Sequence, residues 1–150
     1  MSLIANNKKA YFQYQILEKI EVGIVLNGNE VKALRFRKAS INEAYAETNN
    51  GELWLVNANI SHYSNSDKFS LGEPKRLRKL LAHRREINKI QGKVEKEGMT
   101  IIPLKIYFTK KGLVKLELAI AKGKKLYDKR EDKKKKDWSR QQKRLLKNYK

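Results

Sequence analysis

Apolar and polar residues alternate with a period of two along most of residues 1–121, which predicts antiparallel β-strands with one buried and one polar face. The predicted strands are residues 11–17, 22–26, 41–48, 52–58, 104–108 and 116–120. Asn50-Gly51 supplies the positive φ angles of a type I′ turn, and Lys110-Lys111-Gly112 turns the chain between the last two strands. The pattern therefore predicts two β-hairpins.

The period changes to that of a helix in two segments. Asn29–Phe36 contains helix-forming residues with Val31 and Leu34 on one face, which predicts one or two turns. In Glu73–Glu97 the apolar residues follow one helical stripe, and Pro74 suits a first turn. The members of the stripe are Leu77, Leu80, Leu81, Ile87, Ile90 and Val94. Six short strands around one helical insertion predict a mainly β fold with helices, a small closed or partly open antiparallel barrel.

Charge divides the chain of 150 residues into two parts. Residues 1–121 carry 21 basic and 12 acidic side chains, a net +9, whereas residues 122–150 carry 14 basic and 4 acidic ones, a net +10. We therefore expect a globular domain over residues 1–121 and a basic C-terminal tail over residues 122–150. Because such a tail repels itself, we expect it to be disordered when free and to bind a polyanion. Nucleic acid is favoured over anionic lipid as the partner of the tail, since the tail has few apolar residues and these lie near its C-terminal end.

Aromatic residues are interleaved with basic ones at Lys8–Phe12, Lys125–Arg130 and Lys136–Trp138. Flat rings stack on unpaired bases while lysine and arginine hold phosphates, so this pattern favours single-stranded or loop RNA. For Tyr11, Phe12 and Tyr14 the alternative is packing in the β core. In the tail, Trp138 begins an apolar stripe with Leu145, Leu146 and Tyr149 along a candidate helix. The tail is too short to bury that stripe alone, so a partner surface must complete it.

Several classes of protein are disfavoured by what the sequence lacks. There is no Cys, which excludes disulfides, a thiolate nucleophile and cysteine-based metal sites. The two histidines, His62 and His83, show no metal-ligand spacing, and no phosphate-binding glycine loop is present. No apolar run reaches membrane-spanning length, and the start has no signal-peptide pattern. We therefore expect a cytoplasmic, monomeric, non-catalytic protein with no cofactor, no metal and no membrane association; a structural ribosomal protein and a small nuclease are the alternatives.

Five segments resemble the SsrA-binding protein family, also called small protein B (SmpB), over Asn7 to Trp138. They are Asn7–Ala10, Gly23–Lys32, Arg78–Glu86, Pro103–Phe108 and Ala121–Arg130. The resemblance implies an oligonucleotide-binding-fold barrel that binds the tRNA-like domain of transfer-messenger RNA (tmRNA, or SsrA RNA). It also implies a role in bacterial trans-translation, in which tmRNA is delivered with elongation factor Tu to stalled ribosomes. The tail is then expected in the decoding centre and mRNA channel, against small-subunit rRNA.

The resemblance assigns residues to two RNA-binding sets. In the barrel, Asn7, Glu21 and Leu81 are expected to contact tmRNA, and a second group is expected on its phosphates: Lys8, Lys9, Lys32 and Arg84. The expected decoding-site segment of the tail contains Gly123, Lys124, Lys125, Tyr127, Asp128, Lys129 and Arg130, with Trp138 as the anchor of the tail helix.

The chain departs from the family pattern in two places. Many relatives carry a small residue and a glycine where this chain has Phe36-Arg37, and many carry histidine at the position of Tyr127. The first departure means that the family pattern does not predict the conformation of this turn, and it adds a cation. A neutral phenol at position 127 cannot act as a histidine proton shuttle, so stacking on rRNA bases is the expected role there.

Overall fold

The computed structural model describes residues 2–61 and 73–123, which contain the strands β1–β9 and the helices α1–α3. The strands are β1 (Ser2–Asn6), β2 (Tyr14–Ile24), β3 (Ala39–Ser40), β4 (Tyr45–Asn49), β5 (Glu52–Val56), β6 (Asn59–Ile60), β7 (Arg78–Leu81), β8 (Thr100–Phe108) and β9 (Val114–Gly123). The helices are α1 (Ala10–Gln13), α2 (Gly28–Arg35) and α3 (Arg84–Glu97).

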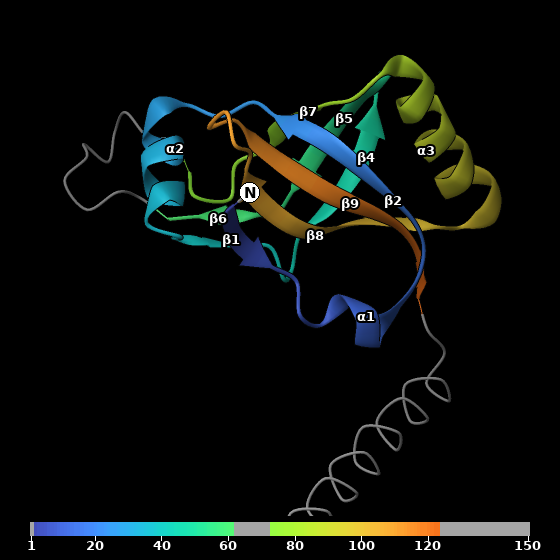
Figure 1. The fold of residues 1–150 in the computed structure, drawn as a ribbon. Helices are drawn as coiled ribbons and strands as arrows, with labels where there is room; N and C mark the ends of the chain where they lie inside the picture. The colour runs from blue at the N-terminus through green and yellow to red at the C-terminus, as the bar shows by residue number, and fades with distance from the viewer. Residues whose placement is uncertain (1, 62–72, 124–150) are drawn as a thin grey trace, which may run out of the picture.

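Six of the strands close into an antiparallel barrel. Pairing runs β8-β4-β5-β7-β2-β9, and β9 pairs back with β8 to complete the circuit. β1 also pairs with β8, further along the strand than β4 does. Figure 1 shows α2 and α3 on opposite sides of the barrel and α1 at the end where the described chain stops. This arrangement confirms the predicted mainly β fold, a barrel that resembles the oligonucleotide-binding class.

Aliphatic side chains fill the barrel, and helix residues close it. The interior includes Leu53, Leu80 and Leu116 from strands, Leu34 from α2 and Ile90 from α3, all almost completely buried. A smaller second cluster lies on the outer face of β8 and β9, where Ala10 of α1 covers short and apolar side chains. Its members are Ala10, Ile102, Leu104, Ala119 and Ala121.

Both predicted hairpins are confirmed. β4 and β5 pair from Asn49–Glu52 outward, and Asn50 and Gly51 adopt φ angles of 52° and 76°, as a type I′ turn requires. β8 and β9 pair along almost their whole length. Gly112 (φ 80°) lies in the turn that joins them, where the Thr109 amide donates to the Leu113 carbonyl at 2.8 Å.

The single helix predicted over Glu73–Glu97 is wrong in its first half. Arg78–Leu81 is a strand, β7, inserted between β5 and β2, and the helix begins only at Arg84. In β7, Arg78 and Leu80 are buried while Leu81 is exposed, so the segment follows period two as well as it follows a helical stripe. The pairing of β7 with both neighbours closes the barrel, and this non-local gain outweighs the local helical preference.

Several strand boundaries also differ from the prediction; the strand predicted over residues 41–48, for example, begins only at Tyr45. Ala10–Gln13 is a short helix rather than strand, and β2 is one continuous strand of 11 residues where two were predicted. The reason is that β2 pairs with β9 along its length, through a register shift between Ile16 and Glu18. β9 continues to Gly123, two residues past the predicted domain boundary, so Gly123 belongs to a barrel strand.

The predicted helix over Asn29–Phe36 is confirmed as α2, and both of its ends are capped. At its start, the Asn27 side chain accepts from the Glu30 amide at 2.9 Å and Glu30 accepts from the Asn27 amide at 3.0 Å, which is a capping box. At its end, the Lys38 and Arg37 amides donate to the Ala33 and Leu34 carbonyls, the hydrogen-bond pattern of a Schellman motif. Arg37 occupies the left-handed position of that motif at φ 57°, where glycine is the usual residue.

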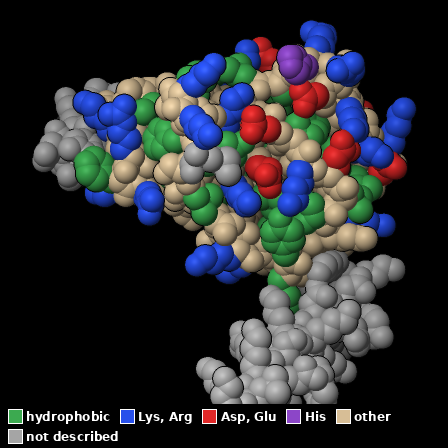
Figure 2. Space-filling view, in the orientation of Figure 1, with side chains coloured by type: hydrophobic (Ala, Val, Ile, Leu, Met, Phe, Trp, Pro, Cys, Tyr) green, Lys and Arg blue, Asp and Glu red, His purple; other side chains and the backbone are tan. Residues whose placement is uncertain are grey.

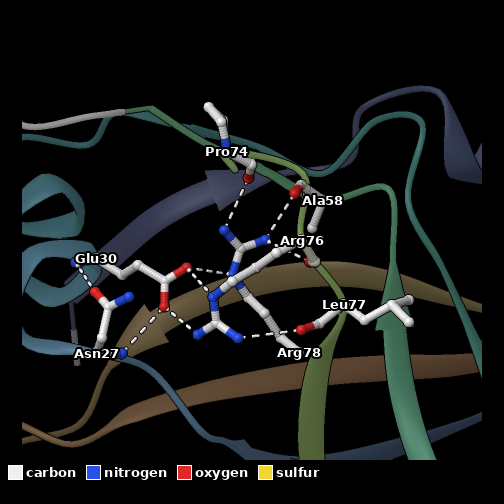
Figure 3. Close-up of polar contacts among 7 residues, drawn as sticks. All are labelled: Asn27, Glu30, Ala58, Pro74, Arg76, Leu77 and Arg78. Carbon is white, nitrogen blue, oxygen red and sulfur yellow. Dashed lines mark hydrogen bonds and ion pairs between the residues drawn. The ribbon is translucent and has the colours of Figure 1, made fainter. Parts of the chain in front are cut away.

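A buried ion-pair network joins α2 to β7 (Figure 3). Arg78 donates to Glu30 Oε2 at 2.6 Å and to the carbonyls of Ala58 and Pro74, both at 2.8 Å. Arg76 donates to both carboxylate oxygens of Glu30. Burial by itself would raise the pKa of Glu30, but the hydrogen bonds from Arg76, Asn27 and Arg78 outweigh it and hold that pKa below its ordinary value.

The tail helix anchored by Trp138, and the state of the tail when free, lie outside the described residues. So do the predicted tail residues Lys124, Lys125, Tyr127, Asp128, Lys129 and Arg130.

Candidate nucleic-acid interface

The first predicted site residue, Asn7, lies inside the protein at the junction of β1 and α1. Its side chain is 3 % exposed, and Nδ2 donates to the Pro103 carbonyl at 3.1 Å. Its backbone amide donates to Leu104, while Oδ1 has no hydrogen-bond partner among the described residues. Asn7 thus ties the chain to β8 where it leaves β1, and the exposed Lys8 and Lys9 follow immediately.

Lys8 and Lys9 lie at the end of the barrel where the basic C-terminal segment begins. Tyr14, the first residue of β2, pairs with Gly123, and Gln15 pairs with Lys122. The four residues of α1 separate Lys9 from Tyr14. Lys8, Lys9 and Lys122 are all exposed, and none forms an ion pair within the part of the chain that the structure describes. This end therefore offers free cations to phosphates.

Glu21 and Leu81 come together on the outer face of the barrel. Gly23 pairs with Leu81, which makes Glu21 and Leu81 diagonal neighbours on one face, about 7–8 Å apart. Leu81 is 53 % exposed. A Cβ atom at position 23 would lie 3.3 Å from the Cβ of Leu81, so glycine there gives this leucine its room.

Arg84 completes this group at the start of α3, three residues after Leu81. A hollow of about 260 Å³ lies beside it, between the β4–β5 turn, β7 and α3. Its lining includes Gly51, Lys79, Leu81 and Arg84, with the Lys79 ammonium 3.4 Å from a Glu52 oxygen. An apolar side chain flanked by cations is the arrangement that accommodates an unstacked base and its phosphate.

The Glu21 carboxylate is held by residues of neighbouring strands. The Tyr107 hydroxyl of β8 donates to Oε2, and the Lys115 ammonium of β9 lies 3.8 Å from Oε1. Burial, together with the hydrogen bond to Glu21, raises the pKa of Tyr107 above its ordinary value. The Glu21 side chain nevertheless remains 57 % exposed and accessible to a ligand.

Lys32 is not brought to either of these groups. It lies on α2, which follows the end of β2 that is farthest from Lys8 and Lys9, about 35 Å along the strand. Figure 1 shows α2 on the side of the barrel opposite α3, the helix that begins at Arg84. The exposed cationic neighbours of Lys32 are Arg35, Arg37 and Lys38. Within residues 2–61 and 73–123 none of these four cations forms an ion pair.

The sequence-based reasoning missed Tyr107 as part of the site. Alternation along Leu104–Phe108 places Tyr107 on the polar face of its strand, but its contact with Glu21 depends on the order β8-β9-β2, which no local pattern contains. The same holds for Glu117, which pairs directly with Glu21.

Charge on the surface is mixed rather than uniformly positive. Figure 2 shows acidic side chains lying among lysines and arginines on one face of the molecule. Ion pairs between exposed or half-buried side chains include Lys19 with Glu117, Lys89 with Glu18, and Lys115 with Glu21. Within residues 2–61 and 73–123 there is no group of three or more side chains that could hold a metal ion, and no helix long and apolar enough to cross a membrane.

The barrel and its free cations are typical of small β-barrel proteins that bind nucleic acids. Comparison with known proteins narrows this class: the model of the SmpB protein family matches residues 4–148, and the chain belongs to this family. It is 56 % identical over 146 residues to the SsrA-binding proteins of Afipia carboxidovorans and Bradyrhizobium diazoefficiens, covering 97 % of this chain and 92 % of each relative. The predicted membership is thereby confirmed.

A solved structure shares the fold. A chain of the structure described as "tmRNA-SmpB: a journey to the center of the bacterial ribosome" superposes with a TM-score of 0.68 at 43 % sequence identity. The similarity covers 81 % of this chain and 84 % of that one.

Proposed function

We propose that this protein binds the tRNA-like domain of tmRNA and brings it to stalled ribosomes as the RNA-binding adaptor of trans-translation. The observation that carries the proposal is the match to the SmpB family over residues 4–148, which includes both the barrel and the basic C-terminal segment. The partners are then tmRNA, elongation factor Tu in the delivery complex, and the decoding centre and mRNA channel of the small subunit. The protein acts in the cytoplasm as an adaptor, not as an enzyme.

The barrel contributes two contacts in this proposal. Lys8 and Lys9 bind phosphates, on a support that Asn7 holds in place through Pro103 and Leu104. Glu21 accepts from base or 2′-hydroxyl donors, while Leu81 packs under an unstacked base and Arg84 binds a phosphate. The two contacts are separated by about 23 Å along β2, from Tyr14 to Glu21, so one folded RNA domain must reach both.

The second part of the proposal is a division of labour along the chain. Residues 1–121 recognise tmRNA, and residues 122–150 bind the ribosome, with Gly123 joining the last strand to the tail. The charge of +10 within 29 residues supports binding of this segment to rRNA phosphates. Tyr127 and Trp138 add stacking and apolar contacts there.

A competition binding experiment tests the recognition of tmRNA. Full-length protein is titrated against a labelled tRNA-like domain at physiological salt, with excess ordinary tRNA present. We expect the wild type to bind through the competitor. The double variant K8A/K9A should bind several-fold more weakly, because two phosphate contacts are lost.

The double variant K110A/K111A is the matched control. It removes the same charge from the exposed tip of the β8–β9 hairpin, outside the proposed contacts, and should bind like the wild type. Equal weakening by both double variants, or displacement of the wild type by ordinary tRNA, would reduce the barrel to a nonspecific polycation and overturn the proposal.

A further inference from the structure

Two carboxylates face each other on the outer surface of the barrel. Glu21 of β2 and Glu117 of β9 are directly opposite in the antiparallel register. Like charges in that position repel and destabilise a strand pair. Unless hydrogen-bond donors or cations compensate for it, this repulsion favours a Glu21 side chain that is turned away from Glu117.

Tyr107 of β8, on the other side of β9, supplies a hydrogen-bond donor that holds the Glu21 carboxylate in place. Because β9 lies between β8 and β2, the Tyr107 side chain must cross β9 to reach Glu21, over a strand-to-strand distance of about 10 Å. Tyr107 is only 5 % exposed, so its ring is packed and its hydroxyl has little freedom. That hydroxyl donates to Oε2 of Glu21, while Lys115 lies 3.8 Å from Oε1.

We propose that Tyr107 is a positioning residue for RNA recognition, which fixes the Glu21 carboxylate so that its remaining lone pairs face a hydrogen-bond donor of the bound RNA. The inference rests on the proposed function, in which Glu21 contacts tmRNA. The fitting donors are a guanine N1–H and N2–H pair or a ribose 2′-hydroxyl, since an ionised carboxylate only accepts.

The chemistry of a tyrosine suits this task better than that of a lysine. A neutral phenol donates one directed hydrogen bond and leaves the charge of the carboxylate in place, whereas a second ammonium would neutralise it. The pKa of Tyr107 is raised by burial and by Glu21, so the phenol remains a donor throughout the physiological pH range. The charged groups around the pair are Lys19, Lys105, Lys115 and Glu117.

The test is a double-substitution cycle in the full-length protein, with affinity for the tRNA-like domain as the readout. The variants are Y107F, E21Q and Y107F/E21Q, and Y45F is the control because Tyr45 is exposed on β4, in another part of the barrel. We expect E21Q to weaken binding roughly tenfold, as for a lost hydrogen bond to a charged group, and Y107F to weaken it several-fold. In the E21Q background Y107F should have no further effect, since it acts only through Glu21.

A second readout follows the pair without RNA. The ultraviolet absorbance of tyrosinate is recorded during alkaline titration of the wild type and E21Q. Removal of the carboxylate should let one additional tyrosine ionise at lower pH, and Y107F should remove that same transition from both proteins. Salt dependence of RNA binding should be unchanged in Y107F, because no phosphate contact is lost.

The outcomes separate failure of the inference from failure of the proposed function. Equal weakening by Y107F in the wild-type and E21Q backgrounds, or full binding by Y107F, would overturn the positioning role while leaving tmRNA binding intact. So would a tyrosine titration that E21Q leaves unchanged. A wild type that does not prefer the tRNA-like domain over ordinary tRNA would instead overturn the proposed function.

Discussion

Arg78 and Glu30 form an ion pair inside the protein, with Nε and Oε2 separated by 2.6 Å and side chains only 1 % and 7 % exposed. The two residues are 48 positions apart, so the pair joins α2 to β7 rather than stabilising either element alone. Arg78 also satisfies the carbonyls of Ala58 and Pro74. Removing one partner from such a network leaves buried charge and buried acceptors without compensation.

We therefore predict that R78A lowers the free energy of unfolding by about 3–5 kcal/mol. R76A is the control, since Arg76 binds the same carboxylate but its side chain is 32 % exposed, and its loss should cost about 1 kcal/mol. Urea titrations followed by circular dichroism measure the free energy of unfolding of both variants. Equal destabilisation by the two variants would show that burial of Arg78 does not set its contribution.

The ion pair of Glu30 with Arg78 also predicts how the free energy of unfolding changes as the pH is lowered. The pKa of Glu30 lies below its ordinary value of 4.5, so the folded state holds the carboxylate ionised more strongly than the unfolded state does. Its contribution is fully present above that ordinary value and is lost as pH falls through the lowered pKa of the folded protein.

Urea titrations at decreasing pH, from neutral to below the ordinary pKa of a glutamate, should thus show a steeper loss of stability for the wild type than for E30Q. The variant is less stable at neutral pH but lacks this titrating group. Parallel curves for the two proteins would contradict the assignment.

Local chemistry made part of this fold predictable. Asn50-Gly51 specifies its own turn, and the strands on either side then have no choice of partner. Arg78–Leu81 could not be assigned in the same way, because its leucines fit a helical stripe and only the pairing with β5 and β2 makes it a strand. The burial of Arg78 likewise depends on Glu30, on a different element.

In the candidate site, too, residues in a local motif were predicted from the sequence, whereas contacts between distant strands were not. Lys8 and Lys9 were identified from a contiguous motif, and they lie exposed beside the start of the basic segment. The contact between Tyr107 and Glu21 was not predicted, because it needs the order of three strands and the register of both pairings. Asn7 was expected to face RNA, yet its side chain faces the Pro103 carbonyl.

Replacing Arg37 by glycine is predicted to stabilise the protein. It adopts φ 57° at the end of α2, a conformation that costs a residue with a Cβ atom about 1–2 kcal/mol. Glycine avoids this strain but gains freedom in the unfolded chain, which costs about 0.4–1 kcal/mol. R37G should therefore raise the free energy of unfolding by roughly 0.5–1 kcal/mol.

The matching control is G98A at the end of α3. Gly98 has a φ of 63°, and alanine there should be destabilising by a similar amount. Thermal melts of both variants measure the effect. A destabilised R37G would show that the Arg37 side chain makes a contribution larger than its backbone strain.

The proposed division of labour predicts that binding and rescue can be separated. K129A/R130A removes two cations from the tail segment expected in the decoding site, while every barrel residue proposed to contact tmRNA stays in place. Affinity for the tRNA-like domain should be unchanged, whereas tagging of a stalled nascent chain in a reconstituted translation system should fall by roughly tenfold or more, since two charge-assisted contacts are lost. K133A/K134A carries the same charge change a few residues further along and serves as the control, so that a general effect of tail charge is distinguished from a role of these two positions. If K129A/R130A weakens RNA binding and rescue to the same extent, the barrel and the tail do not act on separate RNAs, and a single extended tmRNA interface would replace the two-part arrangement.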